Sequence, residues 1–161
     1  MDWSQFNRKI RIKAPMDQVY KAWADLDKIS TWFLKSAVLV DSETVRSSVQ
    51  KGDKVEWRWY NYENPSIVEI KQSNGSDQMV FTFGYGMEVR IELSREDEYT
   101  LLSLTQYNIP TGEESRMNFH VGCRQAWSTW MLNLKSWLEH DILLHDKDLG
   151  ERKDLFDFVN T

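Results

Sequence analysis

The sequence contains one cysteine, Cys123, among 161 residues. This excludes an internal disulfide and fits a reducing compartment. No apolar run approaches the roughly eighteen residues of a membrane span, and residues 1–6 lack the basic start and apolar core of a secretory signal. We therefore expect a cytoplasmic protein. Because Cys123 falls on an apolar helical stripe, we interpret it as a buried, inert thiol rather than a nucleophile.

Positive charge is also scarce. The chain has 20 Lys and Arg residues against 25 Asp and Glu residues, a net charge of −5. Nucleic acids and anionic membranes are bound by surfaces with an excess of basic side chains. The charge balance therefore predicts neither a nucleic-acid partner nor a membrane partner.

Motifs that bind metals or activate nucleophiles are absent as well. The three histidines, His120, His140 and His145, form no HExxH pattern, and on a helix the last two would lie on different faces. No Gly-x-Ser-x-Gly elbow is present, and Gly84-Tyr85-Gly86 lacks the lysine of a phosphate loop, so we interpret it as a turn. We predict no catalytic residue, no metal ligand and no cofactor. The strand carboxylates occupy outward-facing positions: Glu56, Glu69, Glu88 and Glu92.

A long amphipathic helix is predicted from Asn118 to His145, with an acidic pair, Glu113 and Glu114, near its start. Its apolar residues recur three and four positions apart, and such a stripe requires a large apolar partner surface. Gly122 is unfavourable inside a helix, so we interpret it as a point of close approach to a sheet. The stripe consists of Phe119, Cys123, Trp127, Trp130, Met131, Leu134, Trp137, Leu138 and Ile142.

The preceding chain predicts one strand, two short helices and six further strands. Residues 8–14 alternate between apolar and basic side chains, and Pro15 ends this strand. The first short helix contains Val19 to Trp23, and the second buries Ile29, Trp32 and Phe33. Residues 41–51 form a polar loop. The remaining strands are expected at about residues 37–40, 55–60, 66–72, 79–83, 87–93 and 102–106, with turn signals such as Asn74-Gly75 between them.

Strands without crossover helices between them pair as an antiparallel meander. We therefore predict an α+β fold in which a curved, seven-stranded antiparallel sheet wraps the long helix, with two short helices after the first strand. The length suits a single domain, residues 1–161. Residues 146–161 form a C-terminal extension that docks on the same domain or on a second copy, so we expect a monomer or a homodimer. Its apolar residues are Leu155, Phe156, Phe158 and Val159.

Six short sequence patterns follow one another along the chain. They are Ile10-x-Ile12-x-Ala14-Pro15, Val19-Tyr20-x-Ala22-Trp23, Trp32-Phe33, Gly52-Asp53, Phe81-Thr82-Phe83 and Asn133-Leu134-Lys135-Ser136-x-Leu138-Glu139. In this order they resemble the helix-grip fold of the START-like (SRPBCC) superfamily. The nearest branch is the one related to the activator of the heat-shock-protein-90 ATPase, in its bacterial form. The resemblance covers nearly the whole chain, and it implies a ligand cavity between sheet and helix.

Aromatic side chains either fill this core or wall a cavity, and the residues alone allow both. A buried ring needs no ligand to be stable, whereas an empty pocket of about 300 Å³ would cost about 7 kcal/mol. The resemblance favours a cavity for a small apolar or aromatic molecule, in which Tyr85, Gln106 and Tyr107 orient the guest through hydrogen bonds. The predicted ligand-binding residues are Trp32, Phe33, Trp57, Trp59, Phe81, Phe83, Tyr85, Gln106, Tyr107, Trp127, Trp130, Met131 and Leu134.

Three functions stay open at this point. The first is non-catalytic binding of an apolar or aromatic ligand, which we favour because no titratable side chain is predicted inside. The second is a cyclase- or hydrolase-type enzyme that uses the same cavity. The third, implied only by the resemblance, is a co-chaperone-like regulator of the heat-shock-protein-90 ATPase.

Overall fold

The computed structural model describes residues 1–40, 46–151 and 157–161. Its elements confirm the predicted order of one strand, two short helices, six strands and a long helix. In chain order they are β1 (Phe6–Ile12), α1 (Met16–Ala24), α2 (Leu26–Trp32), β2 (Ser36–Leu39), β3 (Lys54–Arg58), β4 (Ser66–Ser73), β5 (Gln78–Thr82), β6 (Glu88–Glu96), β7 (Tyr99–Tyr107), α3 (Glu113–Ser115), the π-helix η1 (Arg116–Val121) and α4 (Gly122–His140).

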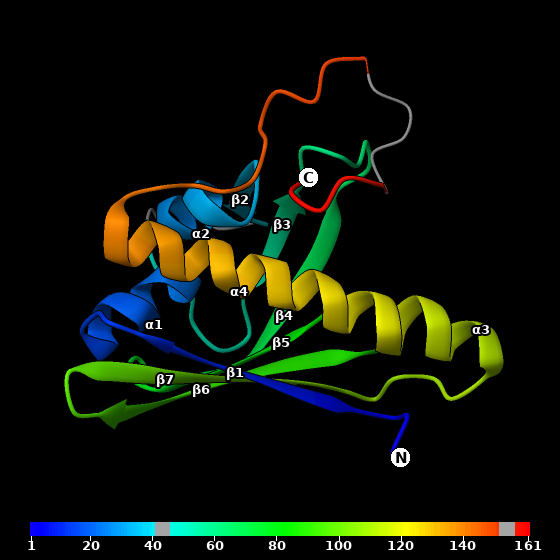
Figure 1. Cartoon of the computed structure of the whole chain (residues 1–161), viewed down its shortest axis with the longest axis horizontal. Coiled ribbons are helices and arrows are strands. Elements are labelled where there is room, and N and C mark those ends of the chain that lie inside the picture. The colour runs from blue at the N-terminus through cyan, green and yellow to red at the C-terminus, as the bar shows by residue number, and fades with distance from the viewer. Residues whose placement is uncertain (41–45, 152–156) are drawn as a thin grey trace.

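The seven strands form one sheet in the order β1-β7-β6-β5-β4-β3-β2. Every pairing is antiparallel. The long helix crosses one face of the sheet, and α1 and α2 lie beside the C-terminal end of α4 (Figure 1). This arrangement confirms the helix-grip, α+β prediction.

The core lies between the sheet and α4. On β7 the side chains of Leu102, Leu104 and Gln106 are buried, while their neighbours in the strand are partly exposed. This two-residue alternation is what a strand with one covered face requires. From the helix, Trp127 and Leu134 are buried against the sheet. The predicted inner face of the last strand is therefore confirmed.

The long helix ends earlier than predicted. It stops at His140 because Asp141 adopts a left-handed conformation, φ 56° and ψ 33°, which ends helices. The prediction that the helix continues to His145 is therefore wrong. Ile142, assigned to the buried stripe, is 55% exposed, and His145 lies beyond the helix in the segment that follows.

Gly122 does not mark a close approach to the sheet, so that interpretation is wrong. It is exposed, and a Cβ atom built there would have one neighbour within 4 Å, the backbone oxygen of Met117 at 3.5 Å. Gly122 donates its N–H to this same oxygen, five residues earlier, where the π-helical turn passes into α4. Its position thus reflects the backbone of the helix, not contact with the sheet.

The chain after α4 returns across the molecule. It runs over α2 and ends near the loop between β3 and β4 (Figure 1). The Asp146 N–H donates to the Asn160 carbonyl at 2.7 Å, and Leu149 is buried, whereas Val159 is 74% exposed. Leu155 and Phe156 of the predicted extension lie outside the described residues, as do residues 41–45 of the predicted polar loop. Within the described ranges, no helix is long and apolar enough to cross a membrane.

Candidate functional site

A row of aromatic rings occupies the interface between sheet and helix. Phe33, at the end of α2, is its hub: its ring centroid lies 5.6 Å from that of Trp57, 5.3 Å from Trp127 and 5.1 Å from Trp130. Trp57 in turn lies 5.1 Å from Phe81. Ring pairs at these distances are in contact. The rings that were expected to wall a cavity therefore pack against one another along this row.

The predicted ligand-binding residues divide into a deep group and a shallow group. The deep group, all buried, comprises Trp32, Phe33, Trp57, Phe81, Gln106, Trp127, Met131 and Leu134. The shallow group, partly buried and packed against the core, comprises Trp59, Phe83 and Trp130. The shallow residues mark where the interface meets solvent.

Two predicted residues do not join these groups. Tyr107 lies on the opposite face of the sheet from Gln106, where its hydroxyl donates to Glu88 Oε2 at 2.5 Å. Tyr85 is 81% exposed on the turn between β5 and β6, with its ring 4.9 Å from that of Phe119. Gln106 is buried beneath the helix and already bonded, since its amide oxygen accepts the indole N–H of Trp127 at 2.8 Å. The structure thus leaves none of the three as a free polar group inside the row.

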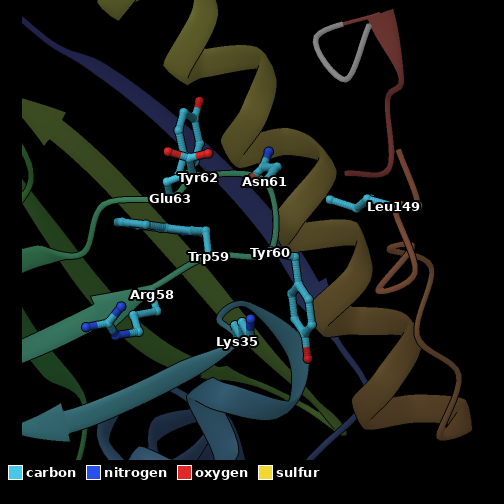
Figure 2. Close-up of a pocket in the computed structure, with 9 residues that line it drawn as sticks. Lys35, Arg58, Trp59, Tyr60, Asn61, Tyr62, Glu63 and Leu149 are labelled. Carbon is cyan, nitrogen blue, oxygen red and sulfur yellow. The ribbon is translucent and has the colours of Figure 1, made fainter. Parts of the chain in front are cut away.

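An open hollow of about 420 Å³ lies at the solvent end of the row. One side is the loop after β3, which contributes Trp59, Tyr60 and Tyr62, and Leu149 of the segment after α4 faces this loop from the other side (Figure 2). The rings of Tyr60 and Tyr62 point in opposite directions (Figure 2). Trp59 connects hollow and row, because its ring lies 6.3 Å from Phe33 and 6.1 Å from Tyr62.

The hollow also has a charged rim. Lys35 and Arg58 line it together with Glu63. Arg58 Nε donates to Glu56 Oε1 at 2.7 Å, whereas the side chain of Lys35 has no ion pair within the described part of the chain. Lys35 is therefore the cation at the rim that is available to an incoming polar group.

Behind the hollow, Asn133 of α4 and His145 form a buried polar pair. Asn133 Nδ2 donates to the Trp32 carbonyl at 2.5 Å and to His145 Nδ1 at 3.0 Å. Asn133 Oδ1 accepts the N–H of Leu144 at 2.6 Å. These bonds attach the chain after α4 to the helix. The His145 ring packs between Trp130 and Tyr60, at centroid distances of 5.4 and 6.1 Å.

Burial determines the charge of His145. Loss of hydration lowers its pKa from 6.5 to about 4, helped by the charge of Lys147 and opposed by that of Asp146. The imidazole is therefore neutral at pH 7. Cys123 is partly rather than fully buried, but this burial still raises the pKa of its thiol, so Cys123 is protonated at this pH, in line with its interpretation as inert.

The other two histidines lie apart from this pair. His120 Nε2 is 3.1 Å from the Gln5 carbonyl, and His140 is exposed at the end of α4. The part of the chain that the structure describes holds no group of three His, Cys, Asp or Glu side chains arranged to bind a metal.

The sequence interpretation missed the hollow and the polar pair. The strand expected at residues 55–60 ends earlier, at Arg58, so alternation does not apply to Trp59 and Tyr60. The run Trp59-Tyr60-Asn61-Tyr62, three aromatics in four residues, was the available signal for a binding loop. Asn133 carried a second signal, because an amide beside Leu134 on an apolar stripe requires buried partners.

Comparison with known proteins identifies one family. Residues 13–139 match the model of the family described as Activator of Hsp90 ATPase homolog 1-like protein. No curated protein matches the sequence.

Solved structures share the fold at low sequence identity. The protein SSP2350 from Staphylococcus saprophyticus matches with a TM-score of 0.71 and 18% identity, over 86% of this chain and 94% of that one. The Aha1 dimer from Colwellia psychrerythraea gives 0.67 and 18%, over 84% and 96%. DynU16, from the dynemicin biosynthetic locus, gives 0.69 and 15%, over 89% and 50%. At these identities the likeness shows the fold alone.

Proposed function

The chain belongs to the Activator of Hsp90 ATPase homolog 1-like family, and on that premise we propose that it binds a small aromatic molecule in the hollow beside Trp59. The observation that carries the proposal is the hollow itself, about 420 Å³ in volume, since ligand sites commonly measure about 300–1,000 Å³. It lies at one end of the sheet–helix interface, where the aromatic row reaches solvent.

The lining supports an aromatic guest. Trp59 and Tyr60 offer ring surfaces that are only partly buried, and aromatic pairs contribute about 0.5–1.5 kcal/mol beyond the area that they bury. The amino group of Lys35 lies at the rim and suits an acceptor or anionic substituent on the guest. A flat molecule with a polar edge therefore fits this lining better than a lipid chain, which would require a deep apolar tunnel.

Binding is favoured over catalysis by the state of the titratable groups. Lys35, Arg58 and Glu63 are exposed to water. The buried imidazole nearby, His145, is neutral at pH 7, and its Nδ1 is already engaged by Asn133. A general base needs a free lone pair directed at its substrate. A cyclase- or hydrolase-type reaction is the alternative, and conversion of a bound compound into product would establish it.

The test is a binding screen with a matched pair of variants. A panel of naphthols, aryl ketones and aromatic acids is screened by native mass spectrometry, and hits are titrated by NMR. Trp59→Ala should weaken binding about tenfold or more, from the loss of a stacked ring. Trp3→Ala is the control, because Trp3 packs on His120 and is no part of the hollow. The proposal fails if no compound binds, or if both variants bind equally.

Regulation of the Hsp90 ATPase is the second candidate, and the family match favours it. This role requires contact with a protein surface instead of a small molecule. Adding the chain to purified Hsp90 and measuring ATP hydrolysis tests it. A rate that stays at its basal value would remove this candidate and leave ligand binding unaffected.

A further inference from the structure

We propose that His145 selects the ligand: its Nε2–H donates a hydrogen bond to an acceptor oxygen, of the carbonyl or ether class, carried by the aromatic molecule. This inference rests on the proposed function and adds to it the recognition group and the chemical class of the guest. Four features of the structure support it.

The first feature is that Asn133 has only one possible orientation. The backbone N–H of Leu144 can only donate, so the atom 2.6 Å away must be the side-chain oxygen of Asn133. The carbonyl of Trp32 can only accept, so the atom 2.5 Å away must be the side-chain nitrogen. Two backbone groups of opposite kind thus fix the amide.

The second feature is the tautomer of His145, which follows from this orientation. Asn133 Nδ2 is a donor, and it lies 3.0 Å from His145 Nδ1. Nδ1 must therefore present its lone pair, and in a neutral imidazole the proton then resides on Nε2. Asn133 acts as a positioning residue, because it sets which nitrogen of His145 carries the hydrogen.

The third feature is that this N–H has no partner. His145 is 9% exposed, and its Nε2 atom is buried without a hydrogen bond to any described residue. Buried donors are nearly always bonded, because an unpaired one loses its hydration without compensation. Trp23 Nε1 is in the same state, but Trp23 lines neither the hollow nor the seam described next.

The fourth feature is the access to His145. A narrow seam beside it has no room for a water molecule, and its lining consists of Phe33, Trp59, Tyr60, Asn61, Trp130, His145, Asp146 and Thr161. The seam and the open hollow share Trp59, Tyr60 and Asn61. Tyr60 follows the end of β3, so its ring can rotate without breaking the sheet. The Tyr60 ring lies 6.1 Å from the His145 ring, and the proposal requires that the guest displaces it to reach Nε2–H.

These features define the class of guest. Nε2–H of His145 is a donor that needs an acceptor, and the seam around it combines the rings of Phe33, Trp59, Tyr60 and Trp130 with the polar residues Asn61, Asp146 and Thr161. An aryl ketone satisfies the N–H, whereas the same arene with carbon in place of oxygen leaves it unpaired. The difference between two such molecules therefore isolates the role of His145.

The experiment compares 2-acetylnaphthalene with its carbon isostere, 2-isopropenylnaphthalene, by NMR titration. Wild-type protein should bind the ketone about tenfold more tightly, the effect of one buried hydrogen bond. His145→Phe should bind both equally, and its binding of the isopropenyl compound shows that it is folded. His145→Gln, which retains an N–H, should preserve the preference.

A second readout needs no variant. The Nε2 proton and nitrogen signals of His145 should shift clearly more with the ketone than with the isopropenyl compound, because both guests carry the same ring but only the ketone accepts the hydrogen bond. If both compounds bind but without preference, or if His145→Phe retains the preference, the role of His145 is refuted and ligand binding stands. If neither compound binds, the inference about His145 fails, and the panel of naphthols, aryl ketones and aromatic acids still decides whether the hollow binds a ligand.

Discussion

Trp127 on α4 donates its indole N–H to the side-chain oxygen of Gln106 on β7, over 2.8 Å. Gln106 is fully buried, and its amide nitrogen contacts Met87 Sδ at 3.2 Å. A polar link inside an apolar layer has to be satisfied at both ends. The bond therefore holds the long helix in register with the sheet, in addition to the packing of the rings.

Loss of this link should destabilise the fold. Gln106→Leu leaves the Trp127 N–H buried and unpaired, and we expect the free energy of unfolding to fall by about 1–3 kcal/mol. Urea denaturation followed by circular dichroism measures it. Ser94→Ala, at an exposed position of β6, is the control and should change stability by less than about 0.5 kcal/mol.

A double-mutant cycle separates the hydrogen bond from side-chain size. In a Trp127→Phe background no N–H remains to be left unpaired, so Gln106→Leu should cost clearly less there than in the wild-type protein. Equal costs in the two backgrounds would show that the bond contributes nothing beyond packing.

Asn133 should control the attachment of the chain after α4. Asn133→Ala removes the acceptor of the Leu144 N–H and the donor to His145, so we expect a loss of about 2–4 kcal/mol. Hydrogen exchange of the Leu144 amide should become much faster. Leu132→Ala lies on the same helix but at a 54% exposed position, and protection of Leu144 should survive it. Unchanged exchange in Asn133→Ala would contradict the assignment.

Gly122→Ala should stabilise the protein by about 0.5–1 kcal/mol, the helix propensity difference. A methyl group there meets only the Met117 oxygen, at 3.5 Å, an ordinary contact. The matched control is Gly84→Ala, where φ is +53° and a side chain introduces strain, so stability should fall. Thermal melts of both variants decide the matter, and destabilisation by Gly122→Ala would mean that the π-helical turn needs glycine.

Acid should weaken the fold through His145. Its pKa is about 4 in the folded chain and 6.5 in the reference state, so the unfolded chain binds the proton first as the pH falls. The stabilisation from neutral His145 is complete above pH 6.5 and is lost between 6.5 and 4, by about 2–3 kcal/mol in total. Denaturation at several pH values measures the slope, and NMR titration of the imidazole measures the pKa.

The variant His145→Gln provides the comparison, because glutamine does not titrate. Between pH 6.5 and 4.5 its stability should vary less with pH than that of the wild-type protein. The charges of Asp146 and Lys147 are the same in both proteins, so their contribution cancels. Parallel slopes, or an NMR pKa near 6.5, would show that His145 is hydrated in solution.

The fold was readable from the sequence because its signals are local. Val89, Ile91 and Leu93 alternate on β6 and face the core, since neighbouring side chains of a strand must point to opposite faces. Trp127, Met131 and Leu134 recur at helical spacing and are buried together. The order of these patterns is also what made the family resemblance visible, and the family match confirms it.

The periodic patterns do not predict the positions of residues beyond the ends of the strands and helices. Tyr60 lies two residues beyond the end of β3, and His145 lies four residues beyond Asp141, the left-handed residue that ends α4. Neither residue belongs to a periodic apolar pattern, so the packing of its loop determines which residues it contacts. The backbone conformation of Asp141 ends the helix early, so His145, expected at the helix end, lies beyond it in a buried place beside Trp130.

Local periodicity thus determined the strands, the long helix and the identity of the apolar face. Long-range packing alone decided the rest: that the rings around Phe33 contact one another, that the open space lies beside Trp59, and that Asn133 meets Trp32, 101 positions away in the chain. A one-dimensional pattern states which face of an element is buried. It does not state which side chains meet there, because that depends on the three-dimensional fit of every element at once.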